Sequence, residues 1–172
     1  PPGHTYSSKT GFSQYCMVPE PEKQNGGENP MEAVRNLLTQ AVVKRLVSDV
    51  PVGVFLSGGL DSSIVAAIAS RHIEGLHTFS VGMEGAPDLK FAREVATIIN
   101  SIHHELIYTE EEMISSLDEI IYYLESFDAA LVRSSFPCYF VSKLAKENGV
   151  KVILTGEGAD EVFGGYLYFH KA

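Results

Sequence analysis

The 172-residue chain has 45% hydrophobic residues and a formal net charge of −9 at pH 7, which suits a single folded domain with its own core. The negative charge argues against broad binding to nucleic acid or to an anionic membrane surface, and no apolar stretch reaches the roughly 18 residues that a membrane span needs. The two cysteines lie far apart and lack a metal-binding spacing, so we expect a reduced, cytoplasmic protein.

Residues 1–28 contain Pro, Gly, Ser, Asn and Gln without a sustained hydrophobic period, which predicts a connecting or peripheral segment. We therefore expect residues 1–28 to be a linker and residues 29–172 to be the folded domain. Asn29 and Pro30 form a helix-start signal, and the residues that follow, as far as Asp49, place apolar side chains on one helix face. That face should pack on the core, and it carries Val34, Leu37, Leu38, Ala41, Val42 and Leu46.

The rest of the chain alternates short apolar runs with helical patterns. The first run, residues 52–57, has no polar alternation, which is typical of a strand covered on both faces. The expected strands are 52–57, 76–82, 103–109 and 151–156. The expected helices are 62–73, 88–101, 110–126 and 134–148, the last one ended by Asn148 and Gly149. This order predicts an α/β fold with a doubly wound, mostly parallel sheet and helices on both faces.

The stretch "SGGLDS", residues 57–62, follows the first predicted strand and opens a helix, which is where ligands bind in such sheets. Adjacent glycines let backbone N–H groups converge, and the helix N-terminus adds partial positive charge, so this turn suits phosphate oxygens. Unlike the usual triphosphate loop, it has no lysine and carries Asp61. A carboxylate beside a polyphosphate needs a divalent cation between them, so we infer Mg²⁺. An ordinary strand-to-helix turn with a Ser/Asp cap is the alternative interpretation.

A second glycine-rich stretch, "TGEGADEVFGGY", gathers Glu157, Asp160 and Glu161 after the last predicted strand. Three carboxylates this close are costly unless a cation or an amine lies among them. The stretch is not a dinucleotide fingerprint, because Glu161 stands where the third glycine is required. The alternative interpretation is a solvated acidic loop.

Other conspicuous side chains are assigned no functional role. His103 and His104 open a predicted strand, where histidines usually serve packing or the surface. The aromatic residues Tyr166, Tyr168 and Phe169 are expected in an interface or in the core.

The S-G-G-x-D-S pattern resembles the pyrophosphate loop of the ATP pyrophosphatase superfamily, which has an adenine nucleotide alpha hydrolase-like fold. The blocks "VPVGVFLSGGLDSS", "FSVGMEGAPDLKFAREVA" and "TGEGADEVFGGYLYFHKA" are similar to the glutamine-dependent asparagine synthetase family, from about residue 30 to the end of the chain. The opening "PPGHTYSSKTG" resembles the end of that family's amidotransferase domain, so the resemblance identifies residues 1–28 as a linker from that domain.

The resemblance implies a role for each matching residue. Glu157 would be catalytic in forming the acyl-adenylate, and Arg133 would stabilise charge on the phosphates. Asp61 and Asp160 would hold Mg²⁺ with the pyrophosphate. The residues implied in ATP binding are Leu56, Ser57, Gly58, Gly59, Asp61, Ser62, Val81, Thr155 and Gly156.

The implied function is an ATP- and Mg²⁺-dependent ligase that activates aspartate as its adenylate, releases pyrophosphate and forms asparagine with ammonia. Ammonia would come from glutamine in the full-length protein, because neither Cys16 nor Cys138 lies in a nucleophile context. Nucleic acid and membrane partners are not expected, whereas a homodimer of the full-length protein is. Ala130 and Leu131 replace two threonines usual in the family, which leaves open a β-lactam synthetase-like enzyme acting on another carboxylate. A non-catalytic nucleotide-binding or oligomer-forming module is the third hypothesis.

Overall fold

The computed structural model describes residues 1–17 and 29–171, which divide into the units Pro1–Val34 and Arg35–Ala172. In the first unit, strands β1 (His4–Ser7) and β2 (Gly11–Gln14) form an antiparallel hairpin. The sequence analysis predicted no strands here, because each run is four residues long and too short to show a period. Residues 18–28 of the predicted linker lie outside the described residues.

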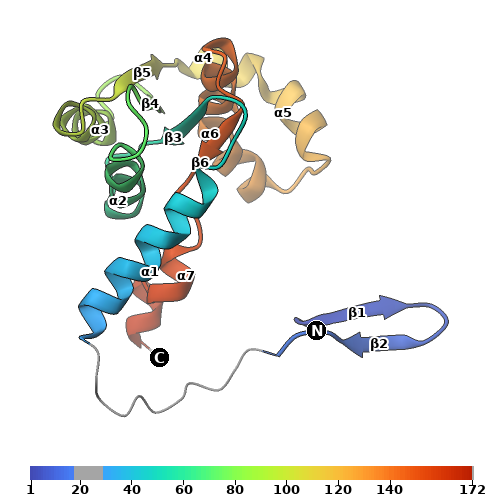
Figure 1. The fold of residues 1–172 in the computed structure, drawn as a ribbon. Helices are drawn as coiled ribbons and strands as arrows, with labels where there is room; N and C mark the ends of the chain where they lie inside the picture. The colour runs from blue at the N-terminus through green and yellow to red at the C-terminus, as the bar shows by residue number, and fades with distance from the viewer. Residues whose placement is uncertain (18–28, 172) are drawn as a thin grey trace. The chain divides into compact units, whose positions relative to one another are not determined.

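The second unit is built on a parallel sheet with the strand order β5-β4-β3-β6 (Figure 1). Its three strand pairs are all parallel. The strands are β3 (Val52–Phe55), β4 (His77–Gly82), β5 (Ile102–Ile107) and β6 (Val152–Leu154). The chain runs outward from β3 to β5 and returns to the other side of β3, as in a doubly wound sheet. The predicted fold class is confirmed.

Helices cover both faces of this sheet, with α2 (Leu60–Ala69) and α3 (Pro87–Ile98) on one face and α6 (Ala129–Glu147) on the other (Figure 1). In the central strand, β3, successive side chains point to opposite faces of the sheet, as cover on both faces requires. Val54 is buried with the helices α2 and α3, whereas Phe55 packs with the residues of α6. Burial on both faces explains why the sequence of β3 is apolar throughout.

Helix α1 (Pro30–Arg45) is shorter than predicted and its apolar face is only partly covered. Val42 is buried and Leu46 packs against the same core cluster. Leu37 is 66% exposed. The expectation that the whole apolar face packs on the core is therefore wrong: the described residues cover only its C-terminal end.

One long helix was predicted for residues 110–126, but the structure contains two, α4 (Glu110–Ser115) and α5 (Leu117–Leu124). The hydroxyls of Ser115 and Ser116 both donate to the carbonyl oxygen of Glu112, at 2.9 and 2.8 Å. Serine hydroxyls that bond to the preceding turn compete with the helical ladder and favour a break.

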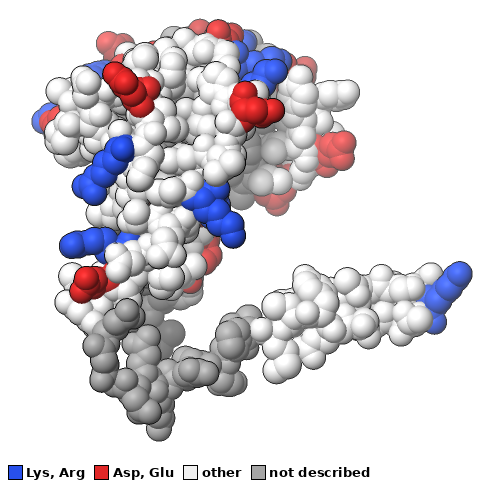
Figure 2. Space-filling view, viewed as in Figure 1, with Lys and Arg blue, Asp and Glu red and all other residues white. Residues whose placement is uncertain are grey.

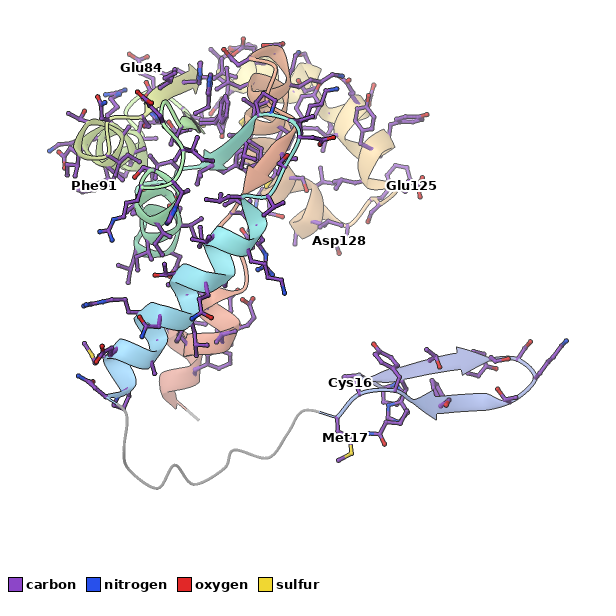
Figure 3. All side chains as sticks on the ribbon, viewed as in Figure 1. Cys16, Met17, Glu84, Phe91, Glu125 and Asp128 are labelled. Atoms are coloured by element: carbon purple, nitrogen blue, oxygen red, sulfur yellow. The ribbon has the colours of Figure 1, made fainter. Side chains whose placement is uncertain are left out.

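Helix α6 begins five residues before its predicted start because Asp128 caps it. The Asp128 carboxylate accepts a hydrogen bond of 2.8 Å from the backbone N–H of Leu131, a standard N-cap contact. Figure 3 shows Asp128 and Glu125 in the connection between α5 and α6. The predicted stop at Asn148 and Gly149 is confirmed, since Asn148 is the C-cap and Gly149 has a φ of 75°.

Charged side chains are scattered over the face of the molecule in Figure 2, with uncharged side chains between them. Across the described residues, no helix is both long and apolar enough to cross a bilayer.

A polar network joins β4 to β5 and explains why histidines occur in this sheet. The two ring nitrogens of His103 lie 3.0 Å from the hydroxyl of Thr78 and 3.2 Å from that of Ser80. His104 and His77 are in hydrogen-bond contact at 2.9 Å. Burial lowers the pKa of His103 and of His104, so both rings are neutral near pH 7. In the structure, His103 and His104 therefore take part in the packing of β4 against β5.

We expect the free energy of unfolding to fall as the pH is lowered from about 6.5. The unfolded histidines take up protons in this range, whereas the folded His103 and His104 do not, so acid favours the unfolded state. The loss per histidine cannot exceed about 1.4 kcal/mol per pH unit, because each unfolded ring takes up at most one more proton than the folded ring. Guanidinium unfolding at several pH values between 5 and 8 measures this change in the free energy of unfolding. His103→Gln should flatten the profile, and exposed His72→Gln should leave it unchanged; equal profiles in all three proteins would contradict the assignment.

Candidate functional site

A cavity of about 610 Å³ opens at the carboxyl ends of β3, β4 and β6. Its lining includes the loops that follow these strands, part of α6, and α7 (Ala159–Phe163), a short helix inside the second glycine-rich stretch. This is the edge of a doubly wound sheet where ligands are expected, and it lies where the strand order reverses around β3.

The loop between β3 and α2 is held in place by its own serine hydroxyls. Ser57 and Ser62 hydroxyls are 3.0 Å apart, and the N–H of Ser57 donates to the Ser62 hydroxyl at 3.3 Å. The N–H of Gly59 donates to the Ser57 hydroxyl at 3.3 Å. The first N–H groups of an α-helix have no partner inside the helix, and those of α2 come directly after this loop. These bonds fix the loop at the N-terminus of α2, which has no side-chain cap, and an uncapped helix N-terminus suits phosphate oxygens.

Gly58 does not line the cavity but sets the path of this loop. Its φ is +80°, a conformation that side-chain-bearing residues rarely adopt. A Cβ at this position would lie 2.6 Å from the Phe91 Cβ and 2.6 Å from the Ala92 backbone nitrogen of α3. Figure 3 shows Phe91 on α3, the helix against which the loop packs. Glycine is therefore required both by the backbone angle and by the close approach of α3.

A second close approach joins the two glycine-rich stretches. A Cβ on Gly156 would lie 2.9 Å from the Ser62 nitrogen and 3.0 Å from the Asp61 Cβ. Because Gly156 has no side chain, the chain leaving β6 passes directly beside the first turn of α2. Asp61 and Glu157 consequently line one cavity although they are far apart in the sequence.

Most residues predicted for the site lie together in this cavity. Those that line it are Leu56, Ser57, Gly59, Asp61, Ser62, Val81, Thr155, Gly156, Glu157 and Asp160. Arg133 is exposed on α6 and is not among the lining residues in the described structure. Leu131, one of the two departures from the family pattern, is also exposed at the start of α6.

The cavity is strongly acidic. Five carboxylates line it, and among the described residues no Lys, Arg or His does so. They are Asp61, Asp88, Glu157, Asp160 and Glu161. A bound polyphosphate would be repelled unless a cation accompanied it.

The donor atoms suit Mg²⁺, because carboxylate oxygens are the ligands that this ion prefers. Asp61 and Asp160 are both half-buried in the cavity lining. Within residues 1–17 and 29–171, no group of three or more His, Cys, Asp or Glu side chains is close enough to hold a metal by itself. The residues therefore fit an ion that takes most of its ligands from substrate phosphates and water, as Mg²⁺ commonly does.

Several groups in the lining have pKa values shifted by their neighbours. The Tyr166 hydroxyl donates to Glu161 Oε1 at 2.6 Å; this contact raises the pKa of Tyr166 to about 12 and lowers the pKa of Glu161. Burial raises the pKa of the Cys138 thiol the most, and the negative charge of Glu157 raises it further. Cys138 is therefore a protonated wall residue near pH 7, and its thiol is a poor nucleophile.

Sequence reasoning missed part of the lining. Asp88 follows the carboxyl end of β4, so the rule for doubly wound sheets could have found it. Cys138 of α6 and Tyr166 could not be found in this way, because only the packing of α6 and of the chain after α7 brings them to the cavity.

Comparison with known proteins finds one matching family model and several similar curated relatives. The family model described as asparagine synthase matches residues 33–172. A relative from Zea mays named "Asparagine synthetase [glutamine-hydrolyzing]" is 48% identical over 184 residues, covering 100% of this chain and 31% of its own length. "Asparagine synthetase [glutamine-hydrolyzing] 1" of Arabidopsis thaliana is 46% identical with 100% and 32% coverage. The chain thus spans about a third of the length of these relatives.

Solved structures support the fold at low identity. An NH3-dependent NAD synthetase from Campylobacter jejuni superposes with a TM-score of 0.53 and 17% identity, over 78% of this chain and 60% of that one. A glutamine-dependent NAD+ synthetase from Acinetobacter baumannii, solved with ADP, gives a TM-score of 0.52 and 16% identity over 95% of this chain and 31% of that one.

Proposed function

The chain belongs to the asparagine synthase family, and from this membership we propose that it is the ATP-dependent, amide-forming part of an asparagine synthetase. An oxygen of the aspartate β-carboxylate would attack the α phosphorus of ATP, and the bond to the leaving pyrophosphate would break. Ammonia would then attack the acyl carbon, releasing AMP and a proton and giving asparagine.

The single observation that best supports this proposal is the meeting of the two glycine-rich stretches in one cavity. The donors of the Ser57–Ser62 loop would hold the departing pyrophosphate, while Leu56, Val81, Thr155 and Gly156 would contact adenosine, largely through backbone groups. Glu157 lies on the chain that passes beside α2. It would orient the reactants and accept a proton from the incoming ammonia.

Asp61 and Asp160 would hold Mg²⁺ together with the phosphate oxygens. When bound, the ion would neutralise charge on the phosphates and so make pyrophosphate a better leaving group. Arg133 is proposed from the family resemblance alone to stabilise the same charge, since its side chain is exposed on α6 outside the cavity lining.

The relatives' length supports a larger working protein. The first relatives are about three times as long as this chain, and their printed names include glutamine hydrolysis. We propose that ammonia comes from a glutaminase part outside these residues and that residues 1–28 lead from it. The partners would be small molecules and a second copy of the full-length protein, and the location would be the cytoplasm.

A different carboxylate substrate is the second candidate, favoured by Ala130 and Leu131, which replace two threonines of the family pattern. Both stand near the start of α6, one turn from Arg133. A change there could alter which acid is activated without altering the phosphate loop.

A pyrophosphate-release assay tests the proposal. We expect the full-length protein with ATP, Mg²⁺ and ammonia to release pyrophosphate with aspartate and not with other amino-acid carboxylates. Omitting each reactant in turn is the control. Release with another acid would favour the second candidate, whereas ATP binding without release from any acid would support a non-catalytic nucleotide-binding module.

A further inference from the structure

A phenol and a carboxylate form a short contact in the wall of the cavity. The hydroxyl of Tyr166 donates to Glu161 Oε1 at 2.6 Å, and both side chains are among the lining residues. Glu161 lies in α7 directly after Asp160. The contact therefore joins α7 to the chain that follows it through one oxygen of the Glu161 carboxylate.

Tyr166 is itself held from several sides. Its ring stacks on that of Tyr168 at 5.1 Å and 9° and meets Phe169 edge-on at 5.7 Å. The backbone before it is folded back on α7, because the N–H of Gly165 donates to the Asp160 carbonyl at 3.0 Å. The phenol is thus fixed by its ring contacts and its backbone, and they do not depend on Glu161.

Glu161 has little else to orient it. Its side chain is exposed on a five-residue helix. The two ion pairs found in the described part of the chain, Lys90 with Glu94 and Arg93 with Glu105, both lie elsewhere. Without the phenol, an exposed glutamate of this kind would sample several rotamers in water and lose a fixed position in the wall.

We propose that Tyr166 is a positioning residue that holds Glu161 in the cavity wall, so that the negative charge of Glu161 acts on the cation held by Asp61 and Asp160 from a distance, without Glu161 being a third direct ligand. This inference rests on the proposed function for the identity of the reactants. It goes beyond the family resemblance, which implied only Asp61 and Asp160 for the ion.

Metal binding by the full-length protein tests this role without requiring turnover. The probe is Mn²⁺, titrated in the presence of α,β-methylene-ATP and followed by electron paramagnetic resonance. Tyr166→Phe keeps the ring stack and removes only the hydroxyl; it should weaken Mn²⁺ binding roughly 2- to 10-fold, the usual value of one net hydrogen bond. Glu161→Gln should weaken it at least as much. Tyr168→Phe is the matched control, because Tyr168 shares the aromatic cluster but is outside the described cavity lining, and it should bind like the wild type.

The outcomes separate the two proposals. Unchanged Mn²⁺ affinity in Tyr166→Phe, or no nucleotide-dependent Mn²⁺ binding by the wild type, would overturn the positioning role. An equal loss in Tyr168→Phe would do the same, because it would point to the aromatic cluster as a whole. If the wild type binds Mn²⁺ with the analogue yet releases no pyrophosphate with any acid, the proposed ligase function fails while the comparison of variants still decides the role of Tyr166.

Discussion

Replacing Gly58 with alanine is expected to abolish ATP binding and to lower the free energy of unfolding by about 2–5 kcal/mol. About 1–2 kcal/mol of this comes from forcing a non-glycine residue to a positive φ, and about 1–3 kcal/mol from overpacking. The new methyl group would meet the backbone of α3 at 2.6 Å, so the loop has to move away from Phe91 and Ala92. Guanidinium unfolding and calorimetric titration with ATP measure the two effects.

Gly85 is a matched control for this substitution. Its φ of +79° is almost the same, but a Cβ there would have nothing within 4 Å. Gly85→Ala should therefore cost only the backbone strain, about 1–2 kcal/mol, and retain ATP binding. If the two variants lose equal stability and bind ATP equally well, the packing of the phosphate loop on α3 has no functional importance.

Replacing Asp61 with asparagine in the full-length protein is expected to reduce pyrophosphate formation by about 10³-fold or more. The asparagine has nearly the same shape, so the fold should be unchanged, but it removes the anionic oxygen proposed to hold Mg²⁺. Loss of that ion costs several kcal/mol of charge stabilisation in the transition state, and each 1.36 kcal/mol is a factor of ten in rate. The initial rate of pyrophosphate release at saturating ATP measures the change.

Asp118→Asn provides the control for this loss of charge, because Asp118 is exposed on α5 away from the cavity lining. Its activity should match the wild type, and the melting temperature of both variants should stay close to that of the unchanged protein. An Asp61→Asn protein that turns over normally would remove the argument for a cation bridge at the first turn of α2.

The parallel sheet could be predicted from the sequence because each of its strands leaves a local pattern. The residues of β3 are buried on both faces, so the whole run is apolar, and the intervening helices have clear periods. The hairpin of residues 4–14 left no comparable pattern, because two four-residue strands show too little alternation. The break at Ser116 was missed because hydroxyl contacts to Glu112 do not disturb the apolar period.

The site was predictable to the extent that it depends on loops after strands. The topology alone places residues 57–62 and 156–161 at one edge of the sheet. The contact of Gly58 with α3 and the contact of Tyr166 with Glu161 depend on tertiary packing, which no local pattern encodes. The role of Arg133 rests on a motif match alone, and its side chain is exposed on α6 outside the described cavity lining.

The pairing of β3 with β6 determines when the cavity can form while the chain is being synthesised. Val52 lies opposite Val152, so the central strand is paired on both edges only after about 100 further residues have been made. Contacts between such distant segments carry a large loop-closure entropy and form slowly. During synthesis the two glycine-rich stretches therefore come together only after β6 has been made, and a nascent chain that stops before residue 152 contains the Ser57–Ser62 loop without the Glu157 segment that completes the wall.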